Sequence, residues 1–323
     1  MKKEVKATMT NKAHEKIPGN PSVSTSSDQK LNDRSNRKSL RVLSEEDWKF
    51  WMHNGYIVIK NAIPKEQAKA TANFIWEFDE KDPNDTSTWY AKPRAEMKMK
   101  ELAGTGMVEA YNHQALWNNR QTQKVYDAFV DVWGTEKLWV TIDRVNLNFP
   151  QRPGEEKEGF IHWDYDPETR PQNVQGVLAL ADQMDESMGG FQCIPWLYRN
   201  YDTWKLTQPE DRHRFQPNLD SLQDKLVKVL MEAGDLLIFN STEPHGIRPN
   251  RSGKKVRIAQ YISMMPAEEE NQELKDWRIN SWKNRVAPVG YAFPGDPRNW
   301  EQEKYKTAEL SKLGKKLLGL ENW

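Results

Sequence analysis

Apolar residues recur every three or four positions in several parts of the chain, which is the spacing of amphipathic helices. The first such stretch begins with Ser44 in the capping-box sequence S-E-E-D and ends before Gly55. Pro64 stands where the next stretch starts, a common first position of a helix. The predicted helices cover residues 44–54, 64–79, 122–132, 270–285 and 306–318.

Other segments are short, rich in β-branched and aromatic residues, and separated by Gly, Pro and Asn. These features are typical of β-strands joined by turns. The predicted strands cover residues 56–59, 138–148, 174–181, 226–231, 236–240 and 256–264. Because no helix of crossover length separates the later strands, we expect an antiparallel sandwich or jelly roll flanked by helices.

Residues 1–40 differ from the rest of the chain. They are polar, with almost no apolar periodicity, so they cannot bury enough surface to offset the entropy lost on ordering. We expect a disordered polar tail over 1–40. Residues 41–323 are expected to form one domain with N-terminal helices and a C-terminal helical extension.

Composition excludes several classes of protein. The 323 residues include 47 basic and 47 acidic side chains, so no general positive field favours nucleic acid. No run of 18 apolar residues or secretory signal is visible, which indicates a soluble, cytoplasmic protein without a membrane partner. With Cys193 as the single cysteine, a bound metal would require imidazole and carboxylate ligands.

One segment supplies such ligands at a suitable spacing. His162 and Asp164 are two residues apart, and side chains at i and i+2 project from the same face of an extended strand. His245 follows a predicted strand and would be the third ligand. Two histidines and one carboxylate leave open positions on an ion, as in non-haem iron(II) oxygenases. Asp166 is the alternative carboxylate.

An arginine interrupts the last predicted strand. Alternation places Arg257 on one face with Ala259 and Tyr261, in a strand otherwise suited to burial. A buried guanidinium requires an anion, and a dicarboxylate would provide a bidentate partner. The alternative is an outward-facing arginine on an edge strand. Arg248 and Arg251 lie in a predicted turn and are expected to be solvated.

These motifs resemble the phytanoyl-CoA dioxygenase family of iron(II)/2-oxoglutarate oxygenases over residues 44–266. The resemblance rests on four motifs in a common order: His162-Trp163-Asp164, the turn from Met188 to Pro195, Gly234-Asp235 before His245-Gly246, and Arg257-Ile258-Ala259. It implies a mainly β fold with flanking helices, the double-stranded β-helix or cupin-like jelly roll.

The resemblance also implies residue roles. His162, Asp164 and His245 would hold iron(II), Arg257 would bind the distal carboxylate of 2-oxoglutarate, and Asn148 would touch this co-substrate. With O2 as the other co-substrate, the expected reaction is hydroxylation of a small molecule, with release of succinate and CO2. Asp164 stands where a halogenase has Ala or Gly, so no chloride site is expected.

Three aromatic residues are candidates for the walls of the substrate pocket: Trp163, Tyr165 and Trp196. In the family, Gly-Ser-His often follows the proline of the Gly-Gly turn, whereas Trp196-Leu197-Tyr198 follows it here. Two other classes of function remain open at the level of sequence. A cupin-type metal enzyme without redox chemistry would ignore 2-oxoglutarate, and a jelly-roll carbohydrate-binding module would require no metal ligands.

Overall fold

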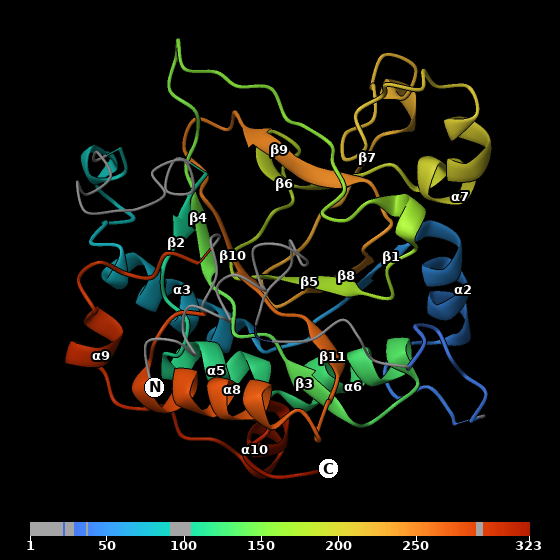
Figure 1. Cartoon of the computed structure of the whole chain (residues 1–323). Helices are drawn as coiled ribbons and strands as arrows, with labels where there is room; N and C mark the ends of the chain where they lie inside the picture. Colours follow the sequence, from blue (N-terminus) through green and yellow to red (C-terminus); the bar gives the residue numbers. More distant parts are fainter. Residues whose placement is uncertain (1–21, 23–28, 37, 91–104, 289–292) are drawn as a thin grey trace.

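The fold is built around one large antiparallel sheet (Figure 1). The computed structural model describes residues 22, 29–36, 38–90, 105–288 and 293–323. Within them, six strands pair antiparallel in the order β1-β8-β5-β10-β4-β2. They are β1 (Tyr56–Ile59), β2 (Met107–Val108), β4 (Val145–Asn148), β5 (Val174–Ala179), β8 (Leu236–Asn240) and β10 (Arg257–Tyr261).

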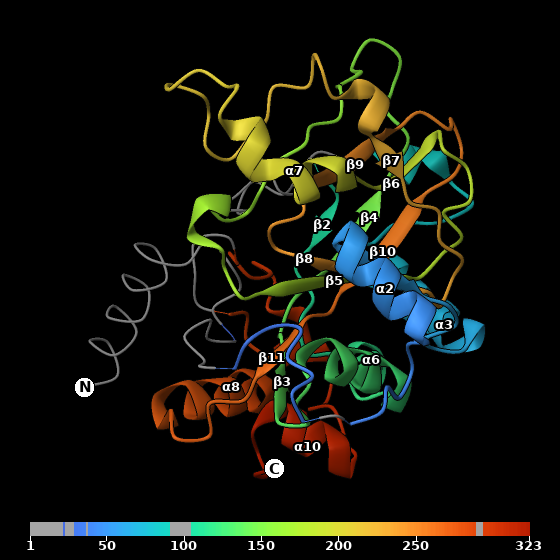
Figure 2. The ribbon, with the colours of Figure 1, turned by 90° about the vertical axis from the view of Figure 1, so that its right-hand side faces the viewer.

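A smaller antiparallel sheet faces one side of the six-stranded sheet (Figures 1 and 2). It contains β7 (Val227–Lys228), β6 (Met188–Cys193) and β9 (His245–Asn250), in that order. Side chains from both sheets meet in one buried cluster, including Val177, Leu237, Phe191 and Cys193. Two facing antiparallel sheets with an apolar interior form the jelly roll that the sequence predicts. Strands β3 (Leu138–Val140) and β11 (Met264–Pro266) pair separately.

Helices cover the other face of the six-stranded sheet, where Leu178, Leu236, Ile238 and Ile258 contribute to the main core. The helices of the described residues are α2 (Glu45–Asn54), α3 (Lys65–Phe78), α5 (Gln114–Arg120), α6 (Gln123–Trp133), α7 (Pro195–Lys205), α8 (Gln272–Asn284), α9 (Trp300–Lys304) and α10 (Lys312–Leu318). Among them, none is long and apolar enough to cross a bilayer.

Several predicted elements differ from the observed ones. The predicted strands 138–148 and 256–264 are each divided into two, and of 226–231 only Val227–Lys228 is a strand. The expected turn at residues 188–195 is instead β6 followed by the start of α7. Pairing of β6 with β9 outweighs the turn tendency of Gly189 and Gly190, which both take positive φ values.

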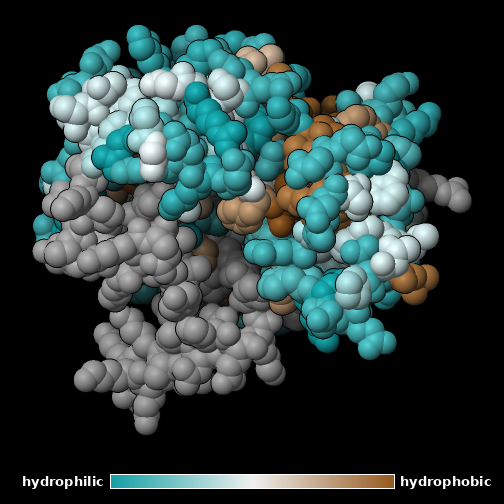
Figure 3. Space-filling model, turned by 90° about the horizontal axis from the view of Figure 1, so that it is seen from above, coloured by the Kyte–Doolittle hydropathy of each residue, from teal (hydrophilic) through white to brown (hydrophobic). Residues whose placement is uncertain are grey.

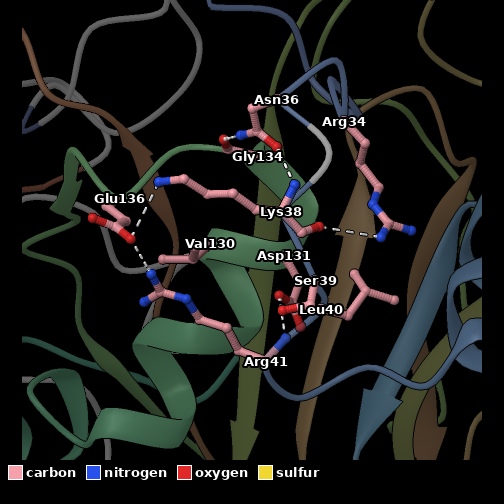
Figure 4. A pocket seen from close by; sticks show the side chains of 10 residues that line it. All are labelled: Arg34, Asn36, Lys38, Ser39, Leu40, Arg41, Val130, Asp131, Gly134 and Glu136. Atoms are coloured by element: carbon pink, nitrogen blue, oxygen red, sulfur yellow. Dashed lines mark hydrogen bonds and ion pairs between the residues drawn. The ribbon is translucent and has the colours of Figure 1, made fainter.

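Residues 29–36 pack on the domain, although they belong to the polar segment expected to be disordered; residues 1–21 and 23–28 of that predicted tail lie outside the described residues. Leu31 is 9% exposed, and the side-chain oxygen of Asn32 accepts the indole N–H of Trp51 at 2.7 Å. Figure 4 shows Arg34, Asn36 and Lys38 to Arg41 against the end of α6, with Asn36 donating to the carbonyl of Gly134. The small pocket drawn there contains none of the predicted ligands.

We therefore expect deletion of residues 1–40 to destabilise the domain. Burial of a leucine and one hydrogen bond together contribute on the order of 2–4 kcal/mol. The midpoint of thermal unfolding should fall by several degrees, and Leu31→Ala alone should reproduce part of that fall. Equal midpoints for the shortened and full-length chains would show that these contacts are dispensable.

His113 caps α5 and makes stability depend on pH. Its Nδ1 accepts the amide N–H of Ala115, and its ring stacks on Phe74 with centroids 3.7 Å apart. Burial lowers the pKa of His113 from 6.5 to about 4. The unfolded chain therefore binds more protons than the folded chain between these values, and stability is lost as the pH falls through that window.

We expect His113→Asn to reduce this pH dependence, because asparagine can cap a helix but does not titrate in this range. At about 1.4 kcal/mol per pKa unit, the wild type should lose on the order of 2–3 kcal/mol between pH 6.5 and pH 4 through this residue. Urea unfolding at both pH values measures the difference. Parallel losses in wild type and variant would rule out His113 as the cause.

Candidate metal and co-substrate site

The two predicted histidine ligands are joined through the backbone. His162 and His245 form an isolated antiparallel bridge, in which each amide N–H donates to the carbonyl of the other residue, at 2.8 and 3.0 Å. Such a pair projects both side chains to the same side. Their ring centroids are 4.7 Å apart. Asp164 lies two residues after His162 and projects with it, as the spacing predicts.

The three side chains present one group of donor atoms. Nε2 of His162 lies 3.2 Å from Oδ1 of Asp164, and Nε2 of His245 lies 3.4 Å from Oδ2 of the same carboxylate. Ligand atoms about 2.1 Å from one ion and at right angles are about 3 Å apart. With ligand atoms that all lie within 4.8 Å of one another, the three side chains could hold one metal ion. The side chains of His162 and Asp164 are 26% and 31% exposed, so the group can be reached from solvent.

Neighbouring groups orient the ligands. Nδ1–H of His245 donates to the carbonyl of Glu243 at 2.9 Å, which leaves Nε2 free to bind a metal. The side-chain amide of Gln175 donates to Oδ2 of Asp164 at 2.5 Å. Gln175 is absent from the predicted site, although a polar residue in the apolar strand β5 was a visible signal. Phe239 and Phe191 pack on the His245 ring, with centroids 4.4 and 5.8 Å away.

Electrostatics favours Asp164 as the charged ligand. Burial acts to raise its pKa, but hydrogen bonds and charge interactions with His162 and His245 outweigh burial and hold the pKa well below its usual value. Asp166, the alternative carboxylate, is occupied elsewhere. It accepts the amide N–H of Glu168 at the start of a short 3-10 helix and lies 3.5 Å from Arg214.

Arg257 faces the interior between the two sheets, as the alternation along its strand predicts. Its neighbour at i+2, Ala259, belongs to the cluster between the sheets, whereas Ile258 belongs to the core under the helices. The Arg257 side chain is 0% exposed, and Nη1 donates to Oδ1 of Asn146 at 2.6 Å. Nε and Nη2 are buried without a hydrogen-bond partner among the described residues.

The other predicted site residues are placed as follows. Asn148 lies opposite Arg257 in the pairing of β4 with β10, and its Oδ1 is buried without a partner in the described part of the chain. Trp163 projects away from the ligand group: its indole N–H donates to the carbonyl of Thr242, and it belongs to the cluster under α7. Trp196 packs against that cluster. The hydroxyl of Tyr165 accepts the amide of Asn173 at 2.7 Å.

Arg248 is not solvated, so that expectation is wrong. It is 3% exposed and donates to main-chain carbonyls of β6, whereas Arg251 is exposed and pairs with Glu158 as expected of a surface residue. Burial of Arg248 depends on carbonyl groups from a distant strand, which sequence periodicity does not reveal.

The residues present fit iron(II) and 2-oxoglutarate. Two imidazoles and a carboxylate match the ligand set of mononuclear non-haem iron sites. The unpartnered nitrogens of Arg257 match a carboxylate, because a guanidinium buried without an anion is costly.

Comparison with known proteins identifies the family of this chain. The model of the family described as phytanoyl-CoA dioxygenase matches residues 51–259. Ava biosynthesis cluster protein O of Aspergillus versicolor is 26% identical over 249 residues, covering 68% of this chain and 77% of its own. A protein of Dictyostelium discoideum that carries the name of a phytanoyl-CoA dioxygenase is 22% identical over 316 residues, covering 84% and 86%.

Solved structures show the same fold. A hypothetical protein JW0805 from Escherichia coli is 16% identical, covers 88% of this chain and 87% of its own, and superposes with a TM-score of 0.62. The GlcNAc Inducible Gene 2 protein of Candida albicans is 15% identical, covers 99% and 85%, and has a TM-score of 0.61.

Proposed function

The chain belongs to the phytanoyl-CoA dioxygenase family of iron(II)- and 2-oxoglutarate-dependent dioxygenases, and on that premise we propose that it hydroxylates a small-molecule substrate. We propose His162, Asp164 and His245 as the iron ligands, and Arg257 as the residue that binds the distal carboxylate of 2-oxoglutarate. In the balanced reaction, substrate, O2 and 2-oxoglutarate give hydroxylated substrate, succinate and CO2.

The observation that carries the proposal is that one fold contains both a group of metal ligands and a buried arginine without an anion. The His162–Asp164–His245 group offers ligand atoms to a metal, and Arg257 offers two buried nitrogens to an anion. A metal ion alone would account for the His162–Asp164–His245 group but not for Arg257. If Arg257 had only a structural role, its buried N–H groups would be expected to have hydrogen-bond acceptors. A chelating dicarboxylate accounts for both.

Iron(II) with 2-oxoglutarate supplies the oxidising power for C–H hydroxylation. The chain's own residues set the conditions for it. The three side chains would supply three ligands to the ion and would leave positions open for co-substrates. Gln175 and the carbonyl of Glu243 hold Asp164 and His245 in position. Phe239 and Phe191 form an apolar wall against the His245 ring that excludes water.

Exposed apolar groups near the ligands support a substrate with an apolar part. Phe160 is 53% exposed, and its ring centroid lies 5.0 Å from that of His162. Phe215, whose carbonyl accepts the amide N–H of Trp163, is 40% exposed. Figure 3 views the end of the molecule where β9 and α7 lie and shows an apolar area among hydrophilic residues. A relative named for a biosynthesis cluster also favours a small molecule.

Incubation of the purified protein with iron(II), O2, 2-oxoglutarate and a metabolite extract tests the proposal. We expect succinate to form and one metabolite to gain the mass of one oxygen atom, with both changes lost when iron is chelated. A metal-dependent change in a metabolite that proceeds without 2-oxoglutarate would instead indicate non-redox chemistry.

A further inference from the structure

Arg248 is a buried arginine to which the proposed reaction assigns no role. It lies on β9, three residues after His245, and is 3% exposed. Its Nη1 donates to the carbonyl of Phe191 at 2.5 Å and its Nη2 to that of Gly189 at 2.6 Å. Its Nε has no hydrogen-bond partner among the described residues. The side chain is therefore fixed by neutral groups, not by a carboxylate.

Gly189 and Gly190 of β6 leave the space that this guanidinium occupies. Gly190 has a φ of 110°, and a Cβ atom added there would lie 2.7 Å from Nη2 of Arg248. Any side chain at this position would displace the arginine. The same pair adjoins Asn148, because a Cβ on Gly189 would lie 3.5 Å from Oδ1 of Asn148.

This arrangement brings Arg248 to the region of Arg257. Asn148 is the strand partner of Arg257. A Cβ on Gly190 would also lie 3.3 Å from Oε1 of Gln183, and the side-chain amide of Gln183 donates to the carbonyl of Ile258, the residue after Arg257. The charges also interact, since burial first and the charge of Arg257 second lower the pKa of Arg248 to about 10. The Arg248 guanidinium remains protonated at neutral pH.

The two arginines have no buried carboxylate between them in the described residues. The acidic group that acts on Arg248 is Glu186, an exposed side chain 2.8 Å from Lys228. Arg257 bonds to the neutral amide of Asn146. Two buried positive charges without an acidic partner repel each other and are costly, so the region favours a ligand that brings negative charge.

We propose that Arg248 is a second residue that selects the co-substrate, favouring 2-oxo acids that carry a distal carboxylate. It acts as a positioning residue. The carbonyls of β6 hold its guanidinium in place, and its positive charge adds to the attraction that Arg257 exerts on the distal carboxylate. This inference rests on the proposed function, in which Arg257 binds that carboxylate directly.

The test compares two ligands of equal chain length. Dissociation constants for 2-oxoglutarate and for 2-oxopentanoate, which lacks the distal carboxylate, are measured on the full chain with iron(II) under argon. We expect Arg248→Met to weaken 2-oxoglutarate at least tenfold and 2-oxopentanoate less than twofold, and Arg248→Lys to restore part of the preference. Arg251→Met, which removes an exposed arginine six residues before Arg257, is the matched control and should change neither constant.

Each result decides between selection and a structural role. Equal weakening of both acids by Arg248→Met, or no change in either, would overturn the inference while wild-type binding of 2-oxoglutarate upholds the proposed function. If Arg248→Met does not fold, Arg248→Gln replaces it, and failure of both to fold would assign Arg248 to structure alone. A wild type that does not bind 2-oxoglutarate would overturn the proposed function and the inference together.

Discussion

Alanine in place of His162, Asp164 or His245 is expected to remove iron binding and to lower 2-oxoglutarate turnover by about a thousandfold or more. The three side chains are the only described group of at least three His, Cys, Asp or Glu residues whose ligand atoms could share one ion. Two remaining protein ligands would bind iron(II) much more weakly than the three that the structure brings together. Iron content after dialysis and succinate formation measure the two effects separately.

Asp166→Asn is the matched control for this experiment. Asp166 is two residues from Asp164, but it bonds to the Glu168 amide and pairs with Arg214. We expect iron binding to remain close to that of the wild type. Loss of iron in Asp166→Asn, together with retention in Asp164→Asn, would show that the ligand assignment is wrong.

Arg257→Ala is expected to raise the KM for 2-oxoglutarate about a hundredfold while leaving iron affinity nearly unchanged. Removing one partner of a buried charge pair costs about 3 kcal/mol or more, and every 1.4 kcal/mol changes affinity tenfold. The lost contact is with the co-substrate, so the metal ligands are untouched. Steady-state kinetics over a range of 2-oxoglutarate concentrations, with iron held saturating, measures the change.

The exposed Arg251 again provides a comparison, because Arg251→Ala removes a positive charge from the same hairpin without removing a buried donor. Its KM for 2-oxoglutarate should stay within about twofold of the wild type, the range expected for loss of a surface ion pair. An unchanged KM in Arg257→Ala would mean that the buried nitrogens of Arg257 have another function.

The parts of the site that sequence predicted are those determined by local spacing. The side-chain alternation of an extended chain brought His162 and Asp164 to one side, and the same alternation directed Arg257 into the sandwich. Both follow from backbone geometry alone. The choice of His245 among six histidines depended on its place after a predicted strand.

Features that depend on partners distant in sequence were missed. The burial of Arg248 requires carbonyl groups of β6, and the resemblance describes residues 188–195 of this region as a turn. Leu31 lies in a polar segment without periodicity, yet it is buried against the domain. A single apolar residue gives no periodic signal, so its tertiary contacts cannot be read from the local pattern.

The bridge between His162 and His245 has a consequence for how the protein acquires its metal. These residues are 83 positions apart in the sequence. The strand that begins at His245, β9, also pairs with β6, which lies between the two histidines in the sequence. Contacts between residues so distant in sequence form late, because chain entropy must be lost before they are made. A nascent or partly folded chain would therefore lack a complete ligand set, so iron capture should coincide with the end of folding and can serve as a probe of that step.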